Sequence, residues 1–104
     1  MNTKELLGLK VKEYRKLKKI TQEKLSELIG VDNGYISKLE VGQNFPSIKT
    51  LEKIANVLEV DLYKLFLYTG EKDINFKIEI NKIYDELNKE KQFALYSIAK
   101  AIKN

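Results

Sequence analysis

The polar side chains of residues 33–38 can form hydrogen bonds with the edges of nucleic-acid bases. The Asn33 carboxamide carries a donor and an acceptor, which together match adenine, and the Lys38 ammonium group can donate to the O6 and N7 atoms of guanine. Tyr35 and Ser37 add a phenol and a hydroxyl to the same segment. These groups favour recognition by hydrogen bonding over the making and breaking of covalent bonds.

The composition removes most catalytic chemistry. The chain has no cysteine and no histidine, which excludes disulfides, thiolate nucleophiles, the commonest general base and the commonest zinc ligand. No carboxylates are paired in a setting typical of acid–base catalysis. We therefore expect a protein that is not an enzyme and has no metal site and no cofactor. The net charge of +4 and the pI near 9.2 favour a polyanionic partner.

The length and composition limit the architecture. A chain of 104 residues, 43% hydrophobic and 33% charged, can bury one modest core, with room for a small appendage. No segment has the composition of a signal peptide, and no apolar run has the length of a membrane span. We therefore expect a soluble, cytoplasmic protein with no membrane partner.

Helical spacing dominates the first part of the chain. Leu7, Val11, Tyr14 and Leu17 lie three or four positions apart, which predicts one apolar stripe on a first helix. The lysines between residues 10 and 19 could add a diffuse positive field there, or form a solvated face.

Residues 21–39 have the pattern of two short helices joined by a turn that contains glycine. Thr21 is a preferred N-cap for a helix over Gln22–Ile29, and Gly30 can adopt the positive φ that ends it. Asp32 is a preferred N-cap for the next helix, over residues 33–39. The expected inner faces are Leu25, Leu28 and Ile29 in the first of these helices and Ile36 and Leu39 in the second.

Two further helices follow a loop over residues 42–46 that is rich in turn-forming residues. Ser47 is a preferred N-cap for a fourth helix, and Asp61 for a short fifth one. The apolar positions of these helices are Ile48, Leu51, Ile54, Ala55 and Leu58, and then Leu62, Leu65 and Phe66.

The remainder of the chain follows a polar linker around Gly70, so we divide the sequence into domains over residues 1–69 and 70–104. Residues 74–80 fit two patterns. Alternation of apolar residues there indicates a strand, whereas the spacing of Phe76, Ile80, Ile83 and Leu87 indicates one face of a helix. We favour a helix over residues 74–87. Asn88 can cap a last helix whose inner face is Leu95, Ile98, Ala99 and Ile102.

Many positions between residues 6 and 66 agree in register with one family pattern. They are Leu7-Gly8, Val11, Arg15, Thr21-Gln22-Glu23, Leu25, Gly30-Val31-Asp32, Ile36-Ser37, Leu39-Glu40, Gly42, Pro46-Ser47, Leu51, Ile54-Ala55, Leu58 and Leu65-Phe66. On these residues the chain resembles the Xre/Cro and lambda-repressor-like transcriptional regulators. The string Gly34-Tyr35-Ile36-Ser37 is also similar to the recognition helix of restriction–modification controller proteins, a branch of that family.

The resemblance implies an all-α fold, with a five-helix lambda-repressor-like DNA-binding domain followed in this chain by a C-terminal helical hairpin. It also implies a function. The protein would be a sequence-specific regulator that binds double-stranded DNA, acts as a repressor and reads the major groove with residues 33–39.

Individual contacts follow from the same resemblance. Asn33, Gly34 and Lys38 occupy the family's usual base-reading positions, and Tyr35 and Ser37 complete the expected base-reading set. Gly34 leaves one reading position without a side chain. The expected phosphate contacts are Thr21, Gln22, Gln43, Asn44 and Lys49. The alternative for each polar residue is an ordinary solvated side chain.

Arg15 and Glu40 have a structural role in the resemblance. In the family this pair forms a partly buried salt bridge that links the first helix to the end of the recognition helix, and a bidentate fork would fix that helix in place. Val41 departs from the family, where a polar or basic residue often follows the glutamate. This departure puts a phosphate contact at that position in doubt.

The C-terminal segment carries more apolar residues than two isolated short helices can bury. Because DNA-binding dimers read two half-sites about one helical turn apart, we expect a homodimer on a palindromic operator, formed through residues 74–104 with help from the fifth helix. The alternative is an antitoxin, in which this segment neutralises a partner toxin by protein contact while the protein autoregulates its operon.

Overall fold

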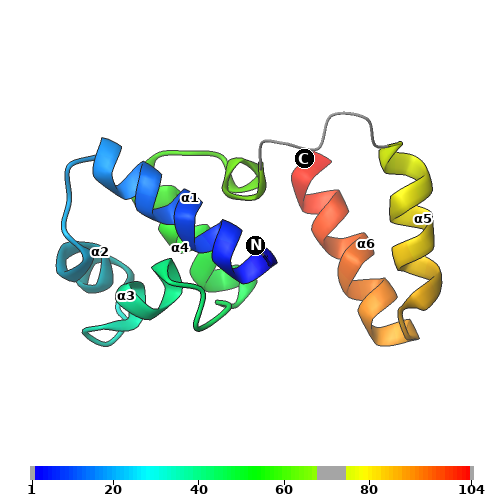
Figure 1. Cartoon of the computed structure of the whole chain (residues 1–104), viewed down its shortest axis with the longest axis horizontal. Coiled ribbons are helices and arrows are strands. Elements are labelled where there is room, and N and C mark those ends of the chain that lie inside the picture. The colour runs from blue at the N-terminus through cyan, green and yellow to red at the C-terminus, as the bar shows by residue number, and fades with distance from the viewer. Residues whose placement is uncertain (1, 68–74, 104) are drawn as a thin grey trace. The chain divides into compact units, whose positions relative to one another are not determined.

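The computed structural model describes residues 2–67 and 75–103, and these residues form helices and no strand. The elements are α1 (Thr3–Leu17), α2 (Gln22–Ile29), α3 (Tyr35–Glu40), α4 (Ile48–Leu58), the 3₁₀ helix η1 (Leu62–Phe66), α5 (Phe76–Glu86) and α6 (Lys89–Lys103) (Figure 1). The all-α prediction is confirmed for the described part. The chain divides into two compact units, whose described residues are 2–67 and 75–103. Within these ranges no helix is long and apolar enough to cross a membrane.

Local capping signals set most of the helix ends. The side chains of Thr21, Ser47 and Asn88 each accept a hydrogen bond from the backbone N–H three positions later, at 3.0, 3.2 and 2.9 Å. Gly30 ends α2 with a φ of 75°, a conformation that glycine adopts without steric cost. These predicted caps are confirmed, because capping depends on a few adjacent residues and not on the rest of the fold.

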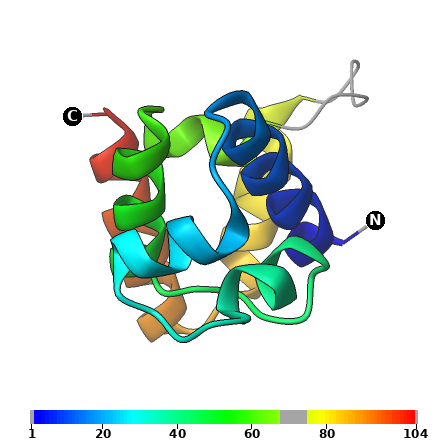
Figure 2. The same cartoon turned by 90° about the vertical axis from the view of Figure 1, so that its left-hand side faces the viewer.

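One core holds the first unit together. Side chains from α1, α2, α3, α4 and η1 form it. In Figure 2, α2 and α3 stand at the front of this unit, beneath α1. The fully buried members are Leu7, Val11, Leu25, Ile36, Leu39, Leu51, Ile54 and Leu65. Because both short helices pack on this core, α3 is held by tertiary contacts more than by its own length of six residues.

Three of the apolar positions predicted to face inward are exposed. Leu17 at the end of α1 is 70% exposed, Leu28 is 50% exposed, and Ile48 at the start of α4 is 36% exposed. Two polar residues, Arg15 on α1 and Ser26 on α2, are buried instead. The prediction was wrong at these positions because periodicity over hydrophobic residues cannot include a buried polar side chain in the inward face.

The third helix begins later than predicted. Asp32 makes no side-chain cap, and the backbone N–H of Tyr35 donates to the Asp32 carbonyl oxygen at 3.1 Å. Gly34 stands at the N-cap position with a φ of 92°, which no right-handed helix can include. Asn33 and Gly34 therefore form a turn before α3, and the predicted range of residues 33–39 becomes Tyr35–Glu40.

The last predicted elements differ in detail from the structure. The fifth helix is the 3₁₀ helix η1, and Asp61 makes no side-chain hydrogen bond at its start. Residues 76–80 lie in α5, so the helical interpretation of that segment is confirmed and the strand alternative is wrong there. Ile74, where the helix was predicted to begin, lies outside the described residues.

Candidate nucleic-acid interface

The turn between α2 and α3 is fixed by backbone hydrogen bonds. The N–H of Gly30 donates to the Glu27 carbonyl oxygen at 3.3 Å, and the N–H of Val31 donates to the Ser26 carbonyl oxygen at 3.0 Å. Together with the left-handed conformations of Gly30 and Gly34, these bonds reverse the chain within a few residues. The arrangement of two short helices joined by such a turn presents one side of α3 to solvent.

The exposed side of α3 carries the predicted base-reading groups. Ile36 and Leu39 are fully buried, so Ser37 and Lys38 point outward and are exposed. Asn33 is exposed in the turn just before the helix. Within the described residues, no side-chain hydrogen bond or salt bridge engages these three polar side chains. Their donors and acceptors are therefore available to a ligand.

Tyr35 and Gly34 lie at the edge of this surface. Tyr35 is half-buried against the core, and this burial raises the pKa of its phenol above the ordinary value. The hydroxyl therefore keeps its proton at neutral pH and can donate a hydrogen bond. A Cβ added to Gly34 would meet no atom within 4 Å, so the space for a side chain at this reading position is open.

Three side chains lock α3 against the rest of the unit. The Arg15 Nε donates to Glu40 Oε2 at 2.7 Å and its Nη2 donates to Glu40 Oε1 at 3.1 Å, which makes a bidentate fork. The Arg15 Nη1 donates to the Ile20 carbonyl oxygen at 2.9 Å. Gln22 Nε2 donates to Glu40 Oε1 at 2.9 Å. The carboxylate at the end of α3 is thus bound to α1 and to the first residue of α2.

Burial makes this lock directional. Arg15 is 9% exposed and Glu40 is 5% exposed, so both charges are nearly removed from water. A buried carboxylate needs several donors to replace its hydration, and three N–H groups supply them here. The bond from Gln22 was not foreseen, because Gln22 was assigned a phosphate and the sequence shows no spacing that joins positions 22 and 40.

Gly8 is a second positional residue that the sequence reasoning named only as part of a pattern. A Cβ at this position would lie 2.7 Å from the Glu40 carbonyl oxygen and would also clash with the Leu39 carbonyl oxygen. Glycine therefore lets α1 approach the backbone at the end of α3. The signal in the sequence was a glycine inside a predicted helix, which commonly marks close packing.

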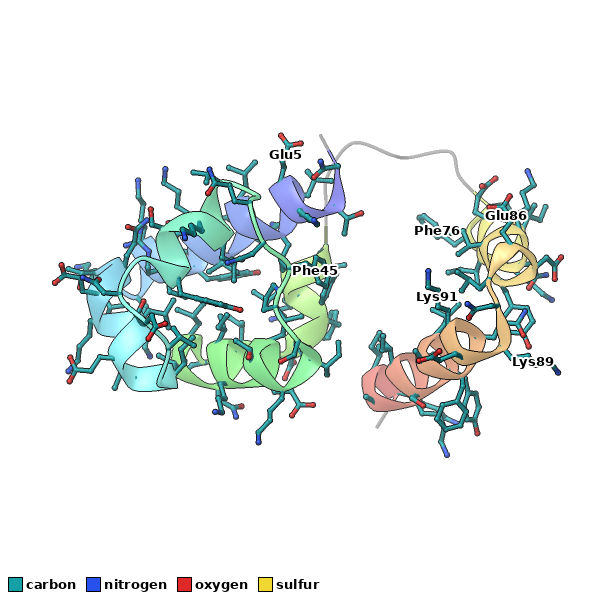
Figure 3. All side chains as sticks on the ribbon, turned by 90° about the horizontal axis from the view of Figure 1, so that it is seen from below. Glu5, Phe45, Phe76, Glu86, Lys89 and Lys91 are labelled. Carbon is teal, nitrogen blue, oxygen red and sulfur yellow. The ribbon has the colours of Figure 1, made fainter. Side chains whose placement is uncertain are left out.

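The predicted phosphate contacts differ in their availability. Thr21 Oγ1 is already the acceptor of a cap hydrogen bond, although its own hydroxyl proton remains free to donate. Gln43 and Lys49 are exposed. Asn44 is half-buried, and its Oδ1 is buried without a hydrogen-bond partner in the described part of the chain. Phe45, beside Asn44 in the same loop, is 44% exposed (Figure 3).

Comparison with known proteins places this architecture in a family. The Helix-turn-helix family model matches residues 11–65. The HTH-type transcriptional regulator SinR of Bacillus licheniformis is 39% identical over 69 residues, which are 65% of this chain and 60% of SinR. The control protein C.SmaI of Serratia marcescens is 32% identical over 73 residues, which are 70% of this chain and 87% of that protein.

A solved structure supports the same grouping. The crystal structure of the restriction-modification controller protein C.AhdI from Aeromonas hydrophila has a TM-score of 0.57 and 32% sequence identity, and the match covers 60% of this chain and 94% of that one. The chain spans about 60% of the length of SinR, so the comparison with SinR concerns only part of that protein. The family match over residues 11–65 and the C.SmaI and C.AhdI similarities agree with the fold described above, and the chain belongs to the Xre and lambda-repressor-like helix-turn-helix family.

Proposed function

We propose that this protein is a sequence-specific, double-stranded-DNA-binding transcriptional regulator that acts as a repressor. The observation that carries the proposal is the outward face of α3, whose polar side chains have no partner among the described residues while the buried Arg15–Glu40 pair fixes the helix behind them. A helix presented in this way fits the major groove, where each base pair displays a distinct set of donors and acceptors. The relatives described as transcriptional regulators and control proteins support the same function.

The residues divide by role in this proposal. Asn33 and Lys38 contact bases, and Ser37 and Tyr35 contact either a base or the adjoining backbone. Gly34 contributes no side chain, so its backbone can approach the DNA closely. Phosphates are bound by Thr21, Gln22, Gln43, Asn44 and Lys49. Gln22 can serve a phosphate and Glu40 together, because its Nε2 carries a second hydrogen.

A homodimer on a palindromic site completes the proposal. Neither α5 nor α6 has a buried residue, and nine large apolar side chains on these helices are exposed. Phe76, whose side chain stands off the first turn of α5 in Figure 3, is 67% exposed. Exposed apolar surface of this extent favours protein–protein contact. A second copy of the same hairpin is the simplest partner for a regulator that reads two half-sites.

Selection of bound sites from a pool of random duplexes tests the function. We expect one enriched sequence with two related halves, separated by about one helical turn, roughly 10 base pairs. A pool that shows no enrichment after repeated rounds would contradict sequence-specific binding.

Substitution of Lys38 tests the assignment of roles. Lys38→Ala should cost about 1–3 kcal/mol of binding free energy at the selected site and relax one base position. Gln22→Ala should weaken binding to selected and random duplexes alike. Lys53→Ala removes the same charge as Lys38→Ala from an exposed position on α4 and serves as the control. Equal losses on both duplexes for Lys38→Ala would exclude base reading by this residue.

A further inference from the structure

A recess of about 240 Å³ lies between α2 and the turn that leads into α3. Its walls are Glu23, Ser26 and Glu27 from α2, with Val31 and Asn33 from the turn. Four of these five residues carry an oxygen in the side chain. None of them belongs to the Arg15–Glu40–Gln22 network, so that network leaves the recess free for another role.

The charges on this recess are not balanced. Glu23 and Glu27 are four positions apart on one helix, so their carboxylates share a face and repel each other. Glu23 forms no salt bridge within residues 2–67 and 75–103. Glu27 reaches only the Lys24 Nζ, at 3.8 Å, and both partners of that pair are largely exposed. A cation placed between the two carboxylates would relieve this repulsion.

The hydroxyl of Ser26 adds an independent indication of a ligand. Ser26 is 3% exposed, lines the same recess, and its Oγ has no hydrogen-bond partner among the described residues. Buried polar atoms are nearly always hydrogen-bonded, and a buried orphan destabilises the fold. A water molecule held by an ion in the recess would supply the missing partner.

We propose that this recess binds a hydrated divalent cation of the Mg²⁺ type. Mg²⁺ usually keeps several of its waters and binds to proteins through one or two carboxylates, which is the set that Glu23 and Glu27 provide. Six waters at about 30 Å³ each need roughly 180 Å³, which the recess can hold. The Asn33 carboxamide oxygen is a further acceptor for the ion's water, and Ser26 Oγ bonds to another.

The position of the ion gives it a role in DNA binding, a consequence that rests on the proposed function. Asn33 lines the recess and also stands among the proposed base-reading residues. A divalent charge beside it would offset two carboxylates that otherwise repel the DNA backbone. The ion-binding step does not depend on that function, because it can be measured on the protein alone.

Paramagnetic broadening by Mn²⁺ tests the site, since Mn²⁺ shares the oxygen ligands and octahedral geometry of Mg²⁺. In amide spectra of the full chain, substoichiometric Mn²⁺ should first broaden the signals of residues 23–27 and 31–33, and excess Mg²⁺ should restore them. The double variant Glu23→Gln, Glu27→Gln should lose this selective broadening. Ser26→Ala should lower the Mn²⁺ affinity by on the order of tenfold, as loss of an outer partner does.

The control removes the same charge elsewhere. Glu13→Gln combined with Glu52→Gln takes two exposed carboxylates from α1 and α4 and should keep the wild-type broadening pattern. Broadening spread evenly over all acidic residues would overturn the proposal, as would selective broadening that survives in the Glu23→Gln, Glu27→Gln variant. A folded protein without DNA binding would leave the ion-binding result intact and would count against the proposed function alone.

Discussion

Glu40 is the residue on which the position of α3 depends. It accepts hydrogen bonds from Arg15 on α1 and from Gln22 on α2, and it is itself the last residue of α3. A buried ion pair adds little stability compared with an apolar pair of the same size, but removal of one partner leaves a charge in the core. Its contribution here is therefore orientation more than net stability.

Replacement of Glu40 by glutamine should show this dependence. Glu40→Gln leaves the Arg15 guanidinium buried without a counter-charge, and we expect a loss of about 3–5 kcal/mol in the free energy of unfolding, measured with urea. Glu13→Gln breaks the exposed pair with Lys10 and should cost only about 0–1 kcal/mol. Equal losses in the two variants would mean that the Arg15–Glu40 pair is effectively solvated.

At the scale of elements, close packing of α1 on the end of α3 requires Gly8. Gly8→Ala would push a methyl group against the backbone carbonyl oxygens of Leu39 and Glu40, and we expect a loss of about 1–3 kcal/mol in unfolding free energy, as for other overpacked sites. Because backbone cannot move aside as a side chain can, α3 must shift. DNA affinity of the folded protein, measured under conditions where it is fully folded, should therefore fall as well.

Gly30→Ala is the matched control for this substitution. A Cβ at Gly30 meets nothing within 4 Å, but its φ of 75° is unfavourable for alanine by roughly 1–2 kcal/mol. The two variants should thus lose similar stability, while only Gly8→Ala displaces the recognition helix. Equal DNA affinities for the two folded variants would contradict the positional role of Gly8.

The C-terminal ends of α1 and α4 meet in an exposed salt bridge. Lys18 Nζ lies 2.6 Å from Glu59 Oε2, and the hydrogen bond and charge of Lys18 lower the pKa of the Glu59 carboxyl. Because the folded pKa is below the unfolded one, the stabilisation is complete above the unfolded value, about 4.3, and disappears as the pH falls through the depressed folded value.

Thermal unfolding measured from neutral to acidic pH should reveal this bridge. Glu59→Gln should lie parallel to the wild type above about pH 5 and lose less stability below it, because glutamine has no proton to gain. High salt should shrink the difference, since both partners are accessible to solvent. A constant gap between the two curves at every pH would show that Glu59 contributes through its backbone conformation alone.

At the scale of the whole molecule, the two units differ in how they bury apolar surface. The first has its own core, whereas no described residue of α5 or α6 is buried. The turn between these helices is nevertheless well defined, since Asn88 caps α6 and Gln92 Nε2 donates to the Tyr84 carbonyl oxygen at 2.9 Å. An ordered hairpin with an exposed apolar surface is consistent with assembly through that hairpin.

Truncation after Leu67 tests this assembly. The shortened chain should fold, remain monomeric in sedimentation experiments and bind a single half-site, because it retains the whole core. The full chain should sediment as a dimer and bind the paired site more tightly. Dimerisation of the truncated chain as strong as that of the full chain would refute the hairpin's role. A monomeric full chain would do the same and would favour a different protein as the partner.

The sequence by itself determined the features that depend on near neighbours. Thr21, Ser47 and Asn88 cap their helices and Gly30 ends α2, because each of these signals acts within one turn of chain. The outward direction of Lys38 also followed from the sequence, since Ile36 and Leu39 had to face inward.

Only the tertiary structure decided the features that depend on distant residues. Arg15 is buried because Glu40 lies 25 positions further along the chain, and no periodicity contains that contact. Asn33 stands in a turn because Gly34 adopts a positive φ, which glycine permits but does not require. Local preference sets where helices can form. Long-range packing and the pairing of buried polar groups set which residues they bury and how α3 is presented.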